Sequence, residues 1–448
     1  MGGGLLQLVA CGAQDAYLSG NPQITFWKGL FKRHTNFAME PFRINLTGQA
    51  AWGVKHSAII GRHADLLYST YLEVSLAPGY YNNDGSRLGY NLLKYVELDI
   101  GGQLIDRLYS EWLFIWDCLT SDVATGLKLA TMVSPPRGSW WETHNVSPPS
   151  FCGGENNSRP SAPEVCYIPL SFFYTRNPGA ALPLIALQYH EVKINIQWND
   201  IKFIAGNFND KNSWPKDPLQ AAIYIDYIYL DTEERRRMAQ ESHEYLIEQL
   251  QYNEDKGITT ANNRIDLTFN HPVKELVWVV QPSSYTDCAL ALKSGKSRLQ
   301  PFTYDWDVVY EQWLQINGQD RLDRRFGSYF NRVQPFQHHT GSTSVVASES
   351  GPNYENGQEA RVPLENKNPG MYMYSFALKP EEHQPSGTCN FSRIDTATLV
   401  VNIAGYDSTY RYDTINISSE DPWNVRVYAV NYNILRIMSG MAGLAYSN

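Results

Sequence analysis

Histidine is the residue type in this chain best suited to chemistry, because imidazole acts as a general base and as a metal ligand near neutral pH. The ten histidines include no H-x-H pair, the spacing that places two metal ligands on one face of a strand. His338 and His339 are adjacent, so in a strand they would point to opposite faces. His190 lies beside Glu191, where neighbouring side chains point apart, so we predict a structural histidine rather than a catalytic dyad.

The catalytic motifs that can be recognised from sequence are missing. G-x-S-x-G, H-E-x-x-H, the P-loop and G-x-G-x-x-G do not occur. Paired carboxylates for glycoside hydrolysis remain open, because their spacing is set in space rather than in sequence, but no pair stands out. We therefore expect no enzymatic activity, no cofactor and no metal.

The six cysteines also lack a chemical pattern, since they contain no C-x-x-C and no metal-like spacing. Cys152 and Cys166 could close a loop, but reduced thiols in a reducing compartment fit the sequence better. We find no secretory signal and no run of eighteen apolar residues.

Asparagines in N-x-S/T sequons are candidates for glycosylation. Asn145, Asn156 and Asn416 lie in predicted loops and are the three sites worth testing. Without a secretory signal, most sequons in this chain are expected to be incidental.

The net charge of −9 argues against a protein whose main surface binds nucleic acid, because phosphate binding needs clustered Lys and Arg. One small basic cluster occurs in residues 1–40, which read as an N-terminal arm. It combines aromatic and basic side chains that would suit a neighbouring subunit or a lipid surface: Phe26, Trp27, Lys28, Lys32 and Arg33. The alternative is that the arm packs on its own domain.

The rest of the chain has the pattern of a half-buried β-structure. From Val192 to Trp198, apolar residues alternate with Lys193, Asn195 and Gln197, which predicts a strand with one buried face. Aromatic residues make up 13% of the chain, and 32 Gly and 24 Pro accompany them. This composition favours sandwiches with long loops.

Several segments of the first half recur in order in the second half. The stretch from Val96 to Gln103 matches Gln312 to Gln319, and each is followed by an Asp-Arg pair and two aromatic residues. Three further matches join 171–172 to 375–376, 195–196 to 402–403 and 226–230 to 431–435. Ordered matches predict two copies of one all-β domain. We place the arm at 1–40, the first domain at 41–232, a linker at 233–243 and the second domain at 244–448.

The chain also resembles a known family, the double jelly-roll major capsid proteins of nucleocytoplasmic large DNA viruses, most closely the algal-virus (phycodnavirus) type. The resemblance covers essentially the whole chain and departs in the loops at 134–163, 281–307 and 340–370. The strings that carry it include GLLQLVACGAQDAYLSGNPQITFWKGLFKRHTNFAME, DYIYLDTEERRRMAQESHEYLIEQLQ, INGQDRLDRRFGSYFNRVQPFQ and NYNILRIMSGMAGLAYSN.

The resemblance implies two consecutive eight-stranded antiparallel jelly rolls with long loops and short helical pieces. It implies a homotrimer of pseudo-hexagonal outline that tiles an icosahedral shell over an internal viral membrane. The expected partners are further copies of the chain, minor capsid proteins, the membrane on the inner face and the host surface on the outer face. The expected location is the virion, after assembly in the host cytoplasm.

Three other functions compete with this one. Trp140, Trp141 and Tyr-rich loops would suit a carbohydrate-binding jelly-roll module, although such lectins are normally secreted. A cupin-type enzyme lacks its histidine ligands here. A minor capsid protein of the same viruses is the third alternative.

Overall fold

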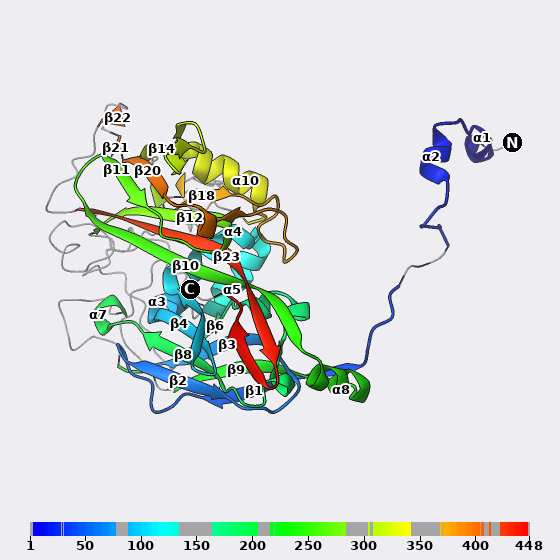
Figure 1. Cartoon of the computed structure of the whole chain (residues 1–448), viewed down its shortest axis with the longest axis horizontal. Coiled ribbons are helices and arrows are strands. Elements are labelled where there is room, and N and C mark those ends of the chain that lie inside the picture. Colours follow the sequence, from blue (N-terminus) through cyan, green and yellow to red (C-terminus); the bar gives the residue numbers. More distant parts are fainter. Residues whose placement is uncertain are drawn as a thin grey trace, which may run out of the picture. The chain divides into compact units, whose positions relative to one another are not determined.

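The computed structural model (Figure 1) describes most of the chain. The described residues are 3–27, 29, 31–77, 88–133, 164–204, 216–218, 220–283, 303–304, 308–341, 368–369, 371–403, 405–406, 412–413 and 422–446. They form two separate units, Met1–Ala38 and Met39–Asn448.

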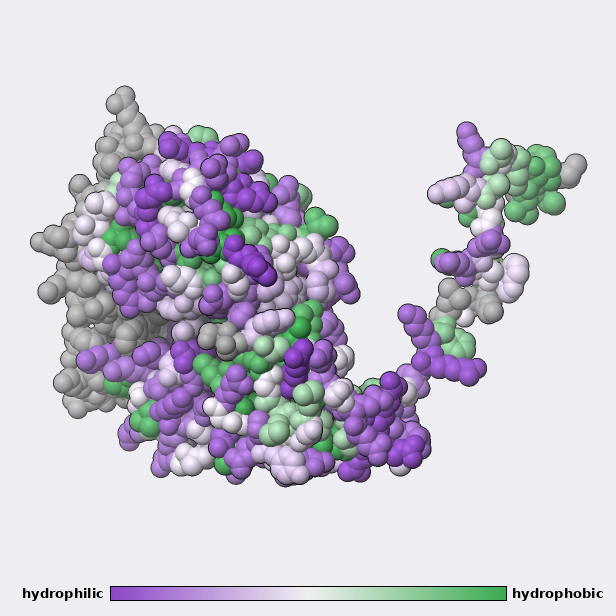
Figure 2. Space-filling model, viewed as in Figure 1, coloured by the Kyte–Doolittle hydropathy of each residue, from purple (hydrophilic) through white to green (hydrophobic). Residues whose placement is uncertain are grey.

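The first unit is the arm, which contains helices α1 (Gly3–Val9) and α2 (Asp15–Ser19). Neither helix buries any of its residues. The side chains of α1 form a hydrophobic surface in Figure 2, and Leu8 is 77% exposed. The arm on its own therefore has no core.

The second unit begins with a sandwich of two sheets whose inner faces alternate apolar residues, as the pattern at 192–198 predicts. The first sheet has the order β1-β9-β3-β6, and the second has the order β2-β8-β4-β5. Their bounds are Phe37–Asn45 for β1, Gln220–Leu230 for β9, Leu66–Leu76 for β3, Glu164–Pro169 for β6, Lys55–Ile60 for β2, Val192–Trp198 for β8, Leu93–Ile100 for β4 and Gln103–Tyr109 for β5.

A second sandwich follows with the same plan. Its sheets have the orders β10-β23-β12-β18 and β11-β20-β14-β15. The bounds are His243–Ile258 for β10, Trp423–Met438 for β23, Pro272–Pro282 for β12, Met371–Ser375 for β18, Asn262–Asp266 for β11, Ala397–Ile403 for β20, Val309–Ile316 for β14 and Gln319–Asp320 for β15.

The two sandwiches have the same strand connectivity. In each, the first strand lies beside the last, and the second lies beside the next to last, which is the arrangement of a jelly roll. Two consecutive eight-stranded jelly rolls are therefore present, and the predicted fold class is confirmed. We call them the first and second rolls.

Short elements connect or edge the main strands. The helical ones are α3 (Leu88–Leu92), α4 (Ser110–Thr120), α5 (Val123–Val133), α6 (Phe173–Arg176), η2 (Pro178–Ala180), η3 (Leu184–Ala186), α7 (Ile201–Ile204), α8 (Thr232–Gln240), η6 (Tyr329–Val333), α10 (Gln334–His338) and η7 (Phe391–Arg393). The extended ones are β7 (Leu182–Pro183), β13 (Thr303–Tyr304), β16 (Arg325–Phe326), β17 (Asn368–Pro369), β19 (Cys389–Asn390), β21 (Gly405–Tyr406), β22 (Tyr412–Asp413) and β24 (Met441–Leu444). Among the described helices, none is long and apolar enough to cross a membrane.

Candidate functional site

Several buried interactions between distant parts of the chain lie where the two rolls meet. One hydrophobic cluster fills the first roll and continues onto the outer face of the second roll's sheet β10-β23-β12-β18, where Val277, Tyr428 and Val430 belong to it. From the first roll, Trp112 of α4 lies with its ring centroid 5.4 Å from that of Tyr428. A shared core of this kind holds the two rolls in one fixed orientation.

An ion pair between the half-buried Glu111 of α4 and the buried Arg426 of β23 crosses this junction. The guanidinium of Arg426 donates to both carboxylate oxygens of Glu111, at 2.6 and 2.7 Å, and the Tyr428 hydroxyl donates to Glu111 at 2.5 Å. Burial by itself lowers the pKa of Arg426, but the adjacent Glu111 carboxylate outweighs it and raises that pKa above its ordinary value. The bidentate geometry fixes α4 along β23.

A second charged group joins α6 of the first roll to two strands of the second. Glu248 of β10 accepts from Arg176 at 2.6 Å and from Lys274 of β12 at 2.7 Å. The Arg176 guanidinium also lies 4.3 Å from the ring centroid of Trp116 in α4. Lys274 has no exposed side-chain surface, and this burial lowers its pKa despite the nearby carboxylates.

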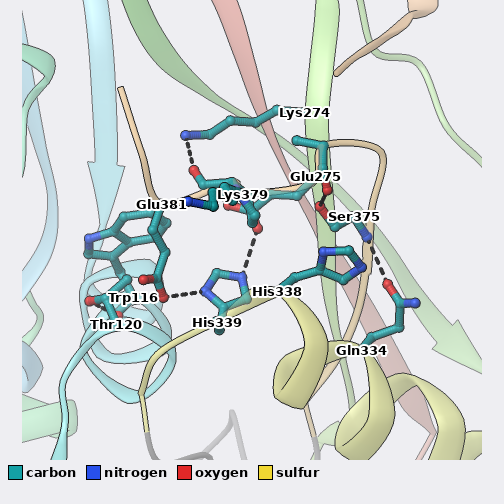
Figure 3. A network of polar contacts seen from close by, with 12 residues as sticks. Trp116, Thr120, Lys274, Glu275, Gln334, His338, His339, Ser375, Lys379 and Glu381 are labelled. Atoms are coloured by element: carbon teal, nitrogen blue, oxygen red, sulfur yellow. Dashed lines mark hydrogen bonds and ion pairs between the residues drawn. The ribbon is translucent and has the colours of Figure 1, made fainter. Parts of the chain in front are cut away.

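The third group is centred on His339, which follows α10 (Figure 3). Its Nε2 lies 2.9 Å from Glu275 and its Nδ1 lies 2.8 Å from Glu381. Burial alone would lower the pKa of His339, but Glu275 and Glu381 raise it to about 9. The imidazole is therefore a cation at neutral pH that donates to two carboxylates.

This histidine resembles part of a catalytic site, but its surroundings suit a structural role. Both ring nitrogens already bind carboxylates, and the side chains of His339 and Glu275 have no exposed surface. A general base needs a free nitrogen within reach of substrate. Over the described part of the chain, no cluster of His, Cys, Asp and Glu could hold a metal ion.

Hydrogen bonds from the backbone complete the junction. The Gly341 amide donates to the carbonyl of Leu119 in α4 at 2.8 Å, and the Leu250 amide donates to Asp106 at 3.0 Å. His190 accepts from the amide of Ala442 in β24 at 3.1 Å, which agrees with the structural role predicted for it. His338, the half-buried neighbour of His339, has its Nδ1 3.1 Å from the Leu378 carbonyl.

The residues singled out from sequence lie elsewhere or outside the described structure. Phe26, Trp27, Lys32 and Arg33 are exposed in the arm, and the structure brings them to no common site. The remaining predicted positions fall outside the described residues: Lys28, Asn145, Asn156, Asn416 and Cys152, so the suggested bridge from Cys152 to the buried Cys166 stays a prediction.

Comparison with known families assigns both rolls. The model described as "Major capsid protein N-terminus" matches residues 25–231, and the model described as "Large eukaryotic DNA virus major capsid protein" matches residues 234–347 and 356–443. Together they cover most of the chain. It belongs to the major capsid protein family of large eukaryotic DNA viruses.

Curated relatives agree over the full length. The chain is 44% identical to the major capsid protein of Pyramimonas orientalis virus and 38% identical to that of Paramecium bursaria Chlorella virus 1, and each alignment covers 100% of both chains. A chain of the PBCV-1 virus capsid quasi-atomic model matches with a TM-score of 0.74 and 34% identity, over 95% of this chain and 100% of that one. The Faustovirus major capsid protein, at 12% identity, shares the fold with a TM-score of 0.66 over 96% of this chain and 94% of that one.

As a member of this capsid family, the chain is a structural subunit of a virion shell. The junction can now be understood in that context, because a capsid building block must present its two rolls in a constant relation to its neighbours. The shared core and the two ion pairs that cross from roll to roll, Glu111–Arg426 and Arg176–Glu248, provide that constancy.

Proposed function

We propose that the chain forms a homotrimer of pseudo-hexagonal outline, and that these trimers tile an icosahedral shell over an internal membrane. The observation that carries this proposal is the identical strand order of the two rolls. Two similar rolls in each of three chains give six similar lobes, so a threefold object can occupy a sixfold lattice position. The rigid junction supports it further, since six lobes form a regular ring only if every chain holds the same angle.

The division of labour along the chain is part of the proposal. Residues 1–40 act as an arm, 41–232 and 244–448 as the two lobes, and 233–243 as a linker, although β1 begins four residues before the first lobe, at Phe37, and β10 one residue before the second, at His243. The placement of α8 supports this division, because the helix spans Thr232–Gln240 and its Arg235 pairs with Asp65 of the first roll at 3.0 Å. The linker is thereby fixed to the first lobe.

The arm is proposed to contact the inner side of the shell. Phe26 and Trp27 are exposed, and Lys32 and Arg33 follow them within the arm, with Lys28 between the two pairs in sequence. Aromatic and basic side chains in one segment suit the boundary between lipid headgroups and acyl chains. Minor capsid proteins are the second expected inner partner, and the host surface is the expected partner of the outer loops.

The remaining expectations follow from the structural role. We infer no catalysis, no cofactor and no sequence-specific binding of nucleic acid, in keeping with the net charge of −9. Assembly in the host cytoplasm agrees with the free thiols of Cys11 and Cys389. Glycans on Asn145, Asn156 and Asn416 remain candidates for detection by mass spectrometry of the purified particle.

The test is the size and outline of the purified protein. Light scattering should give about 153 kDa for three chains of 50.9 kDa each, and negative-stain images of that species should show six-lobed particles. A stable monomer would contradict the proposal. Deletion of residues 1–25 should leave the trimer intact and impair shell formation, whereas loss of the trimer would show that the arm belongs to the subunit's own core.

A further inference from the structure

The two rolls carry equivalent outer sheet faces, and only one of them is covered within the chain. Strand β3 of the first roll corresponds to β12 of the second, and β9 corresponds to β23. Tyr71 of β3 pairs with Tyr224 of β9, and at the corresponding positions Val277 of β12 pairs with Tyr428 of β23. The short edge strands support the same alignment, because β7 pairs with the start of β3 as β19 pairs with the start of β12. Tyr224 is therefore the counterpart of Tyr428.

The burial of these counterparts differs sharply. Val277 is fully buried and Tyr428 is 1% exposed, because the first roll covers them. On the first roll, Tyr71 and Tyr224 are only half-buried, and Tyr167 is 37% exposed. Tyr71 stacks on Tyr224 with centroids 5.5 Å apart and meets the edge of Tyr167 at 6.1 Å. The three tyrosines thus form an aromatic patch on the outer face of the first roll, whereas the first roll covers the equivalent face of the second roll.

The covering element has an equivalent partner as well. Tyr109, at the end of β5, contacts Tyr252 and Tyr428 of the second roll, with ring centroids 4.6 and 6.3 Å away. Pairing with the neighbouring strand identifies the counterpart of Tyr109. Tyr109 lies opposite Tyr95 of β4, and Phe326 of β16 lies opposite Glu311, which holds the same position in β14. Phe326 is 58% exposed. Each roll therefore has a sheet face and a covering edge. Inside the chain, the edge of the first roll covers the face of the second roll, which leaves the edge of the second roll and the face of the first roll unused.

The charges of the unused pair are complementary and opposite to those of the used pair. Inside the chain the covering helix supplies the acid, Glu111, and the sheet supplies the base, Arg426. On the unused face the sheet carries the acids Glu73 and Asp226 beside the tyrosines. On the unused edge, residues 321–325 contain three arginines and one aspartate, and all three arginines are exposed; Arg324 also lies 3.6 Å from Glu311 of β14.

We propose that the outer face of β9-β3-β6, with Tyr71, Tyr224, Glu73 and Asp226, is the docking surface for the β16–η6 edge of a second copy of this chain. This inference rests on the proposed trimer and specifies its seam. Phe326 packs over Tyr224 as Tyr109 packs over Tyr428. Arg324 and Arg325 face the two acids. The reversed charge polarity makes first-to-first and second-to-second contacts repulsive, so the rolls alternate around the ring.

Charge reversal on each side tests the seam. Glu73→Arg with Asp226→Arg should shift the trimer to 50.9 kDa monomers, and Arg324→Glu with Arg325→Glu should do the same, each raising the dissociation constant by about 100-fold or more. Chains that carry all four substitutions should trimerise again, because every seam then has complementary charges. The control matched to the Glu73/Asp226 reversal is Glu233→Arg with Glu234→Arg on α8, a helix with no buried residue; it makes the same change in net charge and should leave the trimer intact.

A neutral pair of variants avoids dependence on charge. Phe326→Ala should weaken the trimer by about tenfold or more, whereas Ile59→Ala, at a side chain 53% exposed on β2, should not change it. Thermal melting of each isolated variant reports whether the rolls remain folded.

The outcomes separate this seam from the trimer itself. A wild-type chain that stays monomeric would overturn the proposed function. A wild-type trimer that survives both charge reversals would overturn only the seam. The seam would also be overturned if both reversals dissociate the trimer and the four-substitution chain, folded by its melting profile, stays monomeric.

Discussion

Replacement of His339 by glutamine should remove a pH-dependent part of the stability of the two rolls. His339 has a pKa of about 9 in the fold against an ordinary 6.5, because Glu275 and Glu381 hold its protonated form. At about 1.36 kcal/mol per pKa unit, the difference corresponds to about 3 kcal/mol. The folded pKa is raised, so this stabilisation is complete below pH 6.5 and is lost as the pH rises through 9.

Thermal melting of wild type and His339→Gln from pH 6 to pH 10 measures this effect. At roughly 2.1 cal/mol/K per residue, about 3 kcal/mol corresponds to a shift of about 3–4 °C for the unit Met39–Asn448. The wild type should melt higher than the variant by that amount near pH 6, and the gap should close by pH 10. His338→Gln is the control, because this half-buried neighbouring histidine contacts the Leu378 carbonyl, and it should not reproduce the pH-dependent gap. An equal gap at pH 6 and pH 10 would refute the assigned charge state of His339.

Two further substitutions probe the junction. Arg426→Met should destabilise the protein by about 1–3 kcal/mol in urea, because the half-buried Glu111 loses its cation. The double variant with Glu111→Gln should recover part of that loss. A loss of under about 1 kcal/mol would mean that water replaces the guanidinium. Burial raises the pKa of Asp106 to about 6, so its charged form is unfavourable in the fold. Asp106→Asn should therefore stabilise the protein at pH 7.5 by up to about 3 kcal/mol and have no effect near pH 4. The same urea midpoints at both pH values check this, and a constant difference would contradict it.

The repeated strands were predictable from sequence because local alternation encodes them. Val192–Trp198 alternates buried and half-buried positions as the pattern predicts. The match of residues 96–103 to 312–319 also holds, since β4 and β14 occupy the same place in their sheets. Short apolar periodicity and a shared turn were sufficient for these elements.

The register of other matches was wrong, and the strand ladders explain why. Leu98 pairs with Ile194 as Leu314 pairs with Leu399, so the counterpart of residues 195–196 is 400–401 and not 402–403. The match of 226–230 to 431–435 sets Tyr227 against Tyr432. Tyr227 lies inside the first roll, whereas Tyr432 lies beside Lys274 at the junction. The first error is a shift of two residues, which keeps each side chain on its face, and the second is a shift of one, which reverses the face of every side chain in the strand. Similarity of letters detects neither.

The helices at the junction gave no usable signal. The segment SEWLFIWDCLT forms α4, but its apolar residues lie on several sides because both rolls pack around it, so no clear helical stripe is visible. The ion pairs are equally hidden, since Glu111 and Arg426 are 315 positions apart. One clue was available in Lys274-Glu275, a charged pair inside an otherwise apolar strand, because buried charges need partners.

The charged groups at the junction are better explained by geometry than by stability. An apolar junction of the same volume would hold the rolls together at least as strongly, since desolvation offsets most of the attraction in a buried ion pair. An apolar surface, however, tolerates small slides and rotations. The buried Arg426 and Glu248 of the second roll pair with Glu111 and Arg176 of the first roll, so any slide separates a buried charge from a partner at a cost of several kcal/mol. The angle between the rolls is therefore fixed, and a ring of six lobes built from three chains closes only when that angle is the same in each.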